Sequence, residues 1–137
     1  MKIGIIGSMN LTEDMYEIRD ELIQLGHQAY LTNLAKPFIG KSEEEKDRIK
    51  IYQKNNLDAM REFWYAMQDG EAVLAVNKTR KGIENYIGGN TFLELGFAHV
   101  LNQRIYLLNP IPEIPFYKSE IEAMSPIIIY GDLTKIK

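Results

Sequence analysis

The stretch KIGIIGSMNLTEDMYEIRDELIQLGHQAYL, residues 2–31, decides the fold. Residues 2–7 form a short apolar run that ends in glycine, which is typical of a strand buried on both faces. Asn10 and Glu13 then have the spacing of a capping box, and apolar residues recur at helical spacing until the next glycine. Residues 27–31 predict a second strand. A strand, a helix and a strand in this order form a βαβ unit, whose strands are parallel and whose crossover is right-handed.

Strands and helices continue to alternate along the rest of the chain. Apolar runs predict three further strands, over residues 72–76, 105–108 and 127–129. Helical spacing predicts one helix over residues 43–68, or two with a break around Asn55-Asn56, and further helices over 91–101 and 119–124. The sequence therefore predicts one α/β domain over residues 1–137. We expect a doubly wound, five-stranded parallel sheet of the flavodoxin or Rossmann type, with helices on both faces.

The composition is that of an ordinary globular domain. The 137 residues are 45% hydrophobic and 26% charged, enough to bury a core without disulfides. The 16 basic and 19 acidic side chains give a net charge of −3, which argues against a general nucleic-acid-binding protein but permits a nucleotide ligand. The lack of cysteine excludes thiol chemistry, and with two histidines no metal site is expected. No apolar run fits a signal peptide or a membrane span, so we expect a cytoplasmic protein without a membrane partner.

Ligands of doubly wound sheets bind at the carboxyl ends of the strands. The candidate substrate-binding residues at these ends follow the first and third strands: Gly7, Ser8, Met9 and Asn77. The first three offer amides and a hydroxyl, although an ordinary turn would contain the same residues. Just beyond Asn77 lies a basic cluster, formed by Lys78, Arg80 and Lys81. This cluster is either a solvated loop or a phosphate contact.

The most informative stretch is Tyr86-Ile-Gly-Gly-Asn-Thr-Phe-Leu-Glu-Leu-Gly-Phe-Ala98. Gly88 and Gly89 allow the backbone to approach a ligand closely, and Asn90 and Thr91 open a helix whose free amides point to the same place. Glu94 is expected in the first turn, in an apolar setting where the helix dipole stabilises its anion, which suits a nucleophile. Thr91 and Glu94 also have the spacing of a capping box. The spacing alone therefore leaves two roles open for Glu94.

Other side chains have weaker indications of function. Asp69 and Glu71 precede the third strand, at its amino end, where a turn or helix-stop role is the simpler interpretation. The apolar loop over residues 110–117 indicates a lid or a subunit contact. We expect the aromatic cluster Phe63, Trp64 and Tyr65 to take part in such a contact.

The chain resembles the nucleoside 2-deoxyribosyltransferase family, including its relatives that hydrolyse deoxynucleoside monophosphates. The resemblance covers most of the chain and rests on the first strand with Gly7-Ser8, the strand over 72–76, and Glu94-Leu-Gly-Phe-Ala98 before the strand over 105–108. It implies that Glu94 attacks C1′ of the deoxyribose, expels the base and forms a glycosyl-enzyme, which a second base or water resolves with retention.

The resemblance also implies an acid at Glu71, or at Asp69 two residues earlier. A second aspartate that the family carries shortly before the nucleophile has no counterpart, because Gly88-Gly89-Asn90 occupies that region. The family's sites borrow residues from a neighbouring subunit, which implies a homo-oligomer, a dimer or larger.

The expected function is cleavage or transfer at the N-glycosidic bond of a nucleoside or nucleotide, by a deoxyribosyltransferase or an N-glycosidase without cofactor or metal. The alternative is a nucleotide-binding or sensing module that keeps the pocket and lacks the chemistry. A third possibility is an interaction protein in which Glu94 is only a cap. The sequence leaves open the base, the sugar and the need for a 5′-phosphate.

Overall fold

Five parallel strands form the central sheet of the computed structural model, which describes every residue from Met1 to Lys137. The strands are β1 (Lys2–Ile6), β2 (Gln28–Tyr30), β3 (Ala72–Ala75), β4 (Arg104–Leu107) and β5 (Ile127–Ile128). Their order in the sheet is β2-β1-β3-β4-β5, so the direction of winding reverses between β1 and β3. The predicted doubly wound parallel sheet is confirmed.

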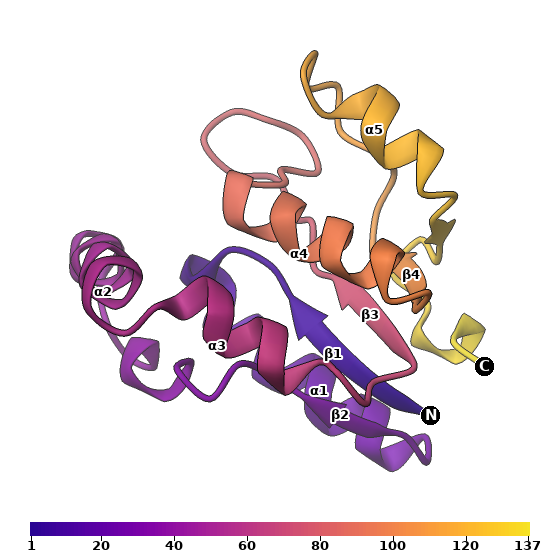
Figure 1. Cartoon of the computed structure of the whole chain (residues 1–137), viewed down its shortest axis with the longest axis horizontal. Coiled ribbons are helices and arrows are strands. Elements are labelled where there is room, and N and C mark those ends of the chain that lie inside the picture. The colour runs from indigo at the N-terminus through magenta and orange to yellow at the C-terminus, as the bar shows by residue number, and fades with distance from the viewer.

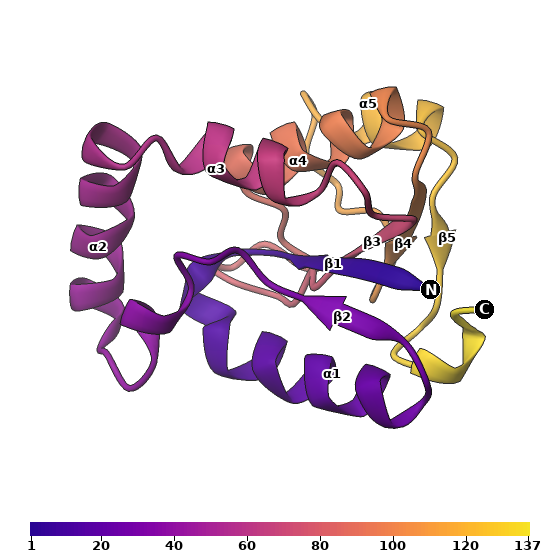
Figure 2. The same cartoon turned by 60° about the horizontal axis from the view of Figure 1, so that its bottom comes forward.

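Helices cover both faces of this sheet (Figures 1 and 2). The helix α1 (Thr12–Gln24) lies on one face, and the other face carries α3 (Ala59–Ala66), α4 (Gly89–Val100) and α5 (Lys118–Ala123). The helix α2 (Glu43–Asn56) stands apart, beyond the carboxyl end of β1. Short 3-10 turns complete the chain: η1 (Met9–Leu11), η2 (Lys36–Phe38) and η3 (Leu133–Lys135). No helix combines the length and the apolar character needed to cross a membrane.

The sheet separates two apolar cores. Successive strand residues point to opposite faces, so Ile5 of β1 packs in the core beneath α1 and Ile6 packs in the core beneath α3 and α4. In the first core Met15 and Leu22 of α1 are completely buried. Because both faces are covered, the strands need no polar alternation, and all four residues of β3 are buried.

Two local predictions are corrected by the structure. Asn10 and Glu13 form no capping box: Ser8 caps the η1 turn, and the Glu13 carboxylate pairs with Lys46 of α2. The break in the long helical stretch falls at Leu57 and Asp58, just after the predicted position. Asp58 has a φ of 47°, in the left-handed region, and its carboxylate accepts a hydrogen bond from the amide of Arg61.

Candidate functional site

A polar cavity of about 230 Å³ lies at the switch point between β1 and β3. It brings together seven residues that the sequence predicts to bind substrate: Gly7, Ser8, Met9, Gly88, Gly89, Asn90 and Thr91. The remaining walls come from α2, from the start of α3 and from the loop after β3: Lys50, Gln53, Lys54, Ala59, Arg80, Lys81 and Tyr86. The cavity is therefore built from segments that are distant in the sequence and meet at the carboxyl edge of the sheet.

The start of α4 forms one wall of the cavity. Gly88 is its N-cap and no side chain caps the helix, so the amides of Gly89, Asn90 and Thr91 have no hydrogen-bond partner within the protein. A Cβ on Gly88 would lie 3.2 Å from the hydroxyl oxygen of Tyr86, so a larger residue there would require the Tyr86 side chain to shift slightly. Free amides at a helix start attract anions and hydrogen-bond acceptors.

Arg80 connects three segments around the cavity. Its guanidinium donates to Ser8 Oγ at 3.0 Å and to Glu43 Oε2 at 3.1 Å, and it lies 5.7 Å from the ring centre of Tyr86. Only 10% of the Arg80 side chain is exposed. The basic cluster predicted after β3 is thus divided: Arg80 and Lys81 line the cavity, whereas Lys78 pairs with Asp14 of α1.

Lys50 approaches the same cavity from α2, where Asp47 lies 3.3 Å from its ammonium group. Burial lowers the pKa of Lys50; the neighbouring Asp47 partly offsets this effect, and the charges of Arg80 and Lys81 add to it. Cations from α2 and from the loop after β3 therefore repel one another across the cavity.

Glu94 lies in the second turn of α4, because the helix begins at Gly89. The capping-box interpretation of Thr91 and Glu94 is wrong, since no side chain caps this helix. Only 7% of Glu94 is exposed, and burial raises the pKa of its carboxyl to about 8, with a further contribution from the charge of Glu62. The expected stabilisation of its anion by the helix dipole is also wrong, because that effect fades beyond the first turn.

A second carboxylate, Glu62 of α3, is close enough for its charge to act on Glu94. Glu62 follows Ala59 by three residues, as Glu94 follows Thr91, and residues at this spacing share one helix face. Since Ala59 and Thr91 line the cavity, Glu62 and Glu94 each follow a residue of the cavity wall by about one helical turn. Glu62 Oε2 accepts a hydrogen bond of 2.6 Å from the hydroxyl of Thr32, which follows β2. The sequence prediction missed Glu62, because no spacing reveals which helices pack together.

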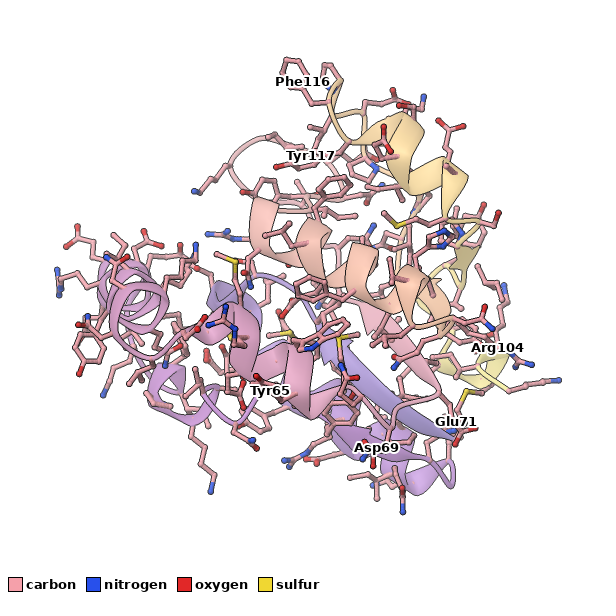
Figure 3. All side chains as sticks on the ribbon, viewed as in Figure 1. Tyr65, Asp69, Glu71, Arg104, Phe116 and Tyr117 are labelled. Carbon is pink, nitrogen blue, oxygen red and sulfur yellow. The ribbon has the colours of Figure 1, made fainter.

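Asp69 and Glu71 lie at the other end of the strands (Figure 3). The ammonium group of Lys2 donates to Asp69 at 2.6 Å, and the amide of Lys2 donates to Glu71 at 3.2 Å. Neither side chain lines the cavity. The structure therefore separates the two predicted acids from the other candidate residues.

Asn77 lies at the expected edge, but its side chain is occupied by the protein. Its amide nitrogen donates to the carbonyl oxygens of Asn109 and Pro110 at 2.8 and 3.1 Å, and its oxygen accepts from the amide of Asn109 at 2.9 Å. Asn77 thus joins the ends of β3 and β4 and does not line the cavity. No group of three or more acidic or histidine side chains forms a metal site.

The fold and the cavity define an α/β protein with a polar cavity, lined by basic residues, at the switch point of its sheet. Neither a protein-family model nor a curated protein sequence matches the chain. A doubly wound fold hosts many activities, so the function has to be inferred from the side chains of the site.

Proposed function

We propose that the protein cleaves or transfers the N-glycosidic bond of a nucleoside or nucleotide, with Glu94 as the nucleophile. The observation that supports this proposal is the position of Glu94: a buried carboxyl one turn behind a polar cavity, beside a second carboxylate, at the ligand edge of the sheet. Perturbed carboxyl groups beside a cavity are typical of catalytic sites.

In the proposed reaction a carboxylate oxygen of Glu94 attacks C1′ of the sugar. The bond between C1′ and the base nitrogen breaks, and the base leaves with the electron pair and takes up a proton from water. Water, or a second base, then attacks C1′ and releases the Glu94 carboxylate, so that two inversions retain the configuration. The sequence analysis expected Glu71 or Asp69 to be the second acidic residue of the site. We propose Glu62 in their place, because Glu71 and Asp69 are bound to Lys2 at the far end of the strands.

A nucleotide-binding or sensing module is the second candidate. One observation favours it: Glu94 does not itself line the cavity, so a ligand can fill the space without touching the carboxyl. The two candidates share a binding site and differ in whether the glycosidic bond breaks.

The test is the release of free base from a panel of nucleosides and nucleotides, with and without a second base, followed by chromatography. We expect Glu94→Gln to fold and to lose cleavage by orders of magnitude, because an amide cannot form the glycosyl-enzyme. Cleavage by the wild-type protein should increase with pH towards about 8, since only the ionised carboxyl attacks. Glu113→Gln is the matched control, because Glu113 is exposed in a loop and pairs with Lys118.

Undiminished cleavage by Glu94→Gln would exclude the nucleophilic role. Nucleotide binding by a wild-type protein that cleaves no member of the panel would favour the sensing module.

We also propose that the protein forms a homo-oligomer through the outer face of α3 and α4. A groove of about 540 Å³ lies there, and Val100 at its rim is 78% exposed. On α3, Tyr65 is 67% exposed, and Phe116, in the loop before α5, projects from the surface in Figure 3 and is 87% exposed. Phe63 is only 1% exposed and belongs to the core, so its predicted role in a subunit contact is wrong.

The cytoplasmic location stays a prediction from the sequence.

A further inference from the structure

Lys50 is a partly buried amine that the proposed reaction does not use. Its side chain is only 21% exposed and lines the cavity from α2. Lys46, one turn earlier on the same helix, is buried outside the cavity, where Glu13 and the carbonyl oxygen of Asn10 accept its hydrogen bonds. Lys50 has one carboxylate partner, Asp47, at 3.3 Å. Of these two lysines, Lys50 is therefore the one whose amine a ligand in the cavity can reach.

Every charged group on the cavity wall is a cation. Arg80 and Lys81 come from the loop after β3, and Lys54 lies one turn after Lys50 on α2. The remaining wall residues carry no charge. Burial and neighbouring cations both favour the neutral amine over the ammonium ion, and they lower the pKa of Lys50 although Asp47 opposes them. The wall thus favours the nucleophilic form of this side chain.

We propose that Lys50 forms a Schiff base with a small, hydroxylated aldehyde bound in the cavity. The cavity volume of about 230 Å³ is below the roughly 300–1,000 Å³ of common ligand pockets. Most of its wall is polar, so the space suits a short, sugar-like carbonyl compound better than an aromatic ring. The Schiff base requires neither Glu94 nor the cleavage of a glycosidic bond.

The step needs a base, and Asp47 is the carboxylate paired with Lys50. Asp47 takes a proton from the ammonium group, the free amine adds to the carbonyl carbon, and one amine proton passes to the oxygen to give a carbinolamine. The hydroxyl then leaves as water with the proton that Asp47 returns. One aldehyde and one ammonium thus give one protonated imine and one water, without an oxidant or a reductant. The free amides of Gly89 and Asn90, which line the same cavity, are donors for the carbonyl oxygen.

The test is reductive trapping. The protein is incubated with glycolaldehyde and sodium cyanoborohydride, and mass spectrometry locates the hydroxyethyl group left on each lysine. We expect Lys50 to be modified at least about tenfold faster than Lys54, because a carbonyl bound in the cavity is held at the Lys50 amine. The rate at Lys50 should saturate with glycolaldehyde, whereas the rate at the exposed Lys54 should rise in proportion. Lys50 should also reach its full rate at a lower pH than Lys54.

Two variants of the loop after β3 separate this chemistry from general lysine reactivity. Lys81→Gln removes one of the cations that act on Lys50 and should slow its modification, since the ammonium form is then favoured. Lys78→Gln is the matched control and should leave the rate unchanged, because Lys78 pairs with Asp14 and does not line the cavity.

Equal rates at Lys50 and Lys54, or a rate at Lys50 that stays proportional to glycolaldehyde, would overturn the inference. An equal slowing in Lys78→Gln would overturn it as well. Saturable trapping on Lys50 by a wild-type protein that releases no base would support the Schiff base and refute the proposed cleavage. Release of base without trapping on Lys50 would refute the Schiff base and leave the proposed cleavage intact.

Discussion

Between pH 4.5 and about 8, Glu94 is protonated in the folded protein and ionised in the unfolded chain. Burial raises the pKa of Glu94 from its ordinary value of 4.5 to about 8. Between these values the folded state binds more protons than the unfolded state, so the free energy of unfolding should fall as pH rises, by about 1.4 kcal/mol per pH unit from this group. Glu94→Gln cannot ionise and should lack this component. Urea unfolding between about pH 5 and 8 checks the difference, and parallel profiles of the two proteins would contradict it.

The charge of Glu62 contributes to the raised pKa of Glu94. In Glu62→Gln the amide oxygen still accepts the hydrogen bond from Thr32, while the negative charge is gone. The pKa of Glu94 should therefore decrease, and the pH dependence of any cleavage should move to lower pH by the same amount. Carbon NMR of the Glu94 carboxyl measures the shift. Glu71→Gln, at the far end of the strands, is the control that should leave it unchanged.

At the scale of elements, Asn77 connects the carboxyl ends of β3 and β4. Asn77→Ala leaves the amide of Asn109 without its acceptor and two carbonyl oxygens without their donor. We expect a loss of about 2–4 kcal/mol in the free energy of unfolding, since buried polar groups lose their partners. Asn109→Ala removes only one side-chain donor, to the Asn77 carbonyl, and should cost about 1 kcal/mol. Equal losses in denaturant unfolding would show that Asn77 does not connect these strands.

The helix α2 is attached to the domain by polar contacts. Lys46 is buried and donates to the carbonyl oxygen of Asn10 at 3.2 Å, and Gln53 donates to that of Leu34 at 3.0 Å. This attachment explains why Lys50 and Lys54 were not predicted as site residues. Lys50 and Lys54 are four residues apart, which indicates that they share one face of α2. The apolar pattern of the sequence does not show where α2 lies, because the buried Lys46, and not an apolar face, positions this helix.

At the scale of the whole molecule, the outer face of α3 and α4 is expected to form the subunit contact. Light scattering at micromolar concentration should give about twice the chain mass of 15.8 kDa. Val100→Glu should shift the protein towards the monomer, because it places a charge at the apolar groove. Ile51→Glu makes the same kind of change on exposed α2 and should have no effect. A monomeric wild-type protein would remove this proposal.

Local signals in the sequence were sufficient for the fold and for much of the cavity. Each buried strand is a short apolar run, and Gly7 after β1 and Gly88-Gly89 at the start of α4 mark segments that line the cavity. The sequence predicted that this helix begins at Thr91. In the structure Gly89 is already helical, which moves Glu94 into the second turn. The approach of Glu62 to Glu94 depends on how α3 packs against α4, and a single sequence contains no signal for that packing.

The order of the strands places the two shortest ones at the margins of the sheet. β2 has three residues and β5 has two, so the outermost strands expose few unpaired backbone groups. Long, flat margins are where sheets of separate molecules join and aggregate. These margins give a second molecule little to pair with, so the sheet resists growth into a continuous ribbon between molecules. The proposed association of this protein with itself would then depend on its side chains, where a single charge should be enough to disrupt it.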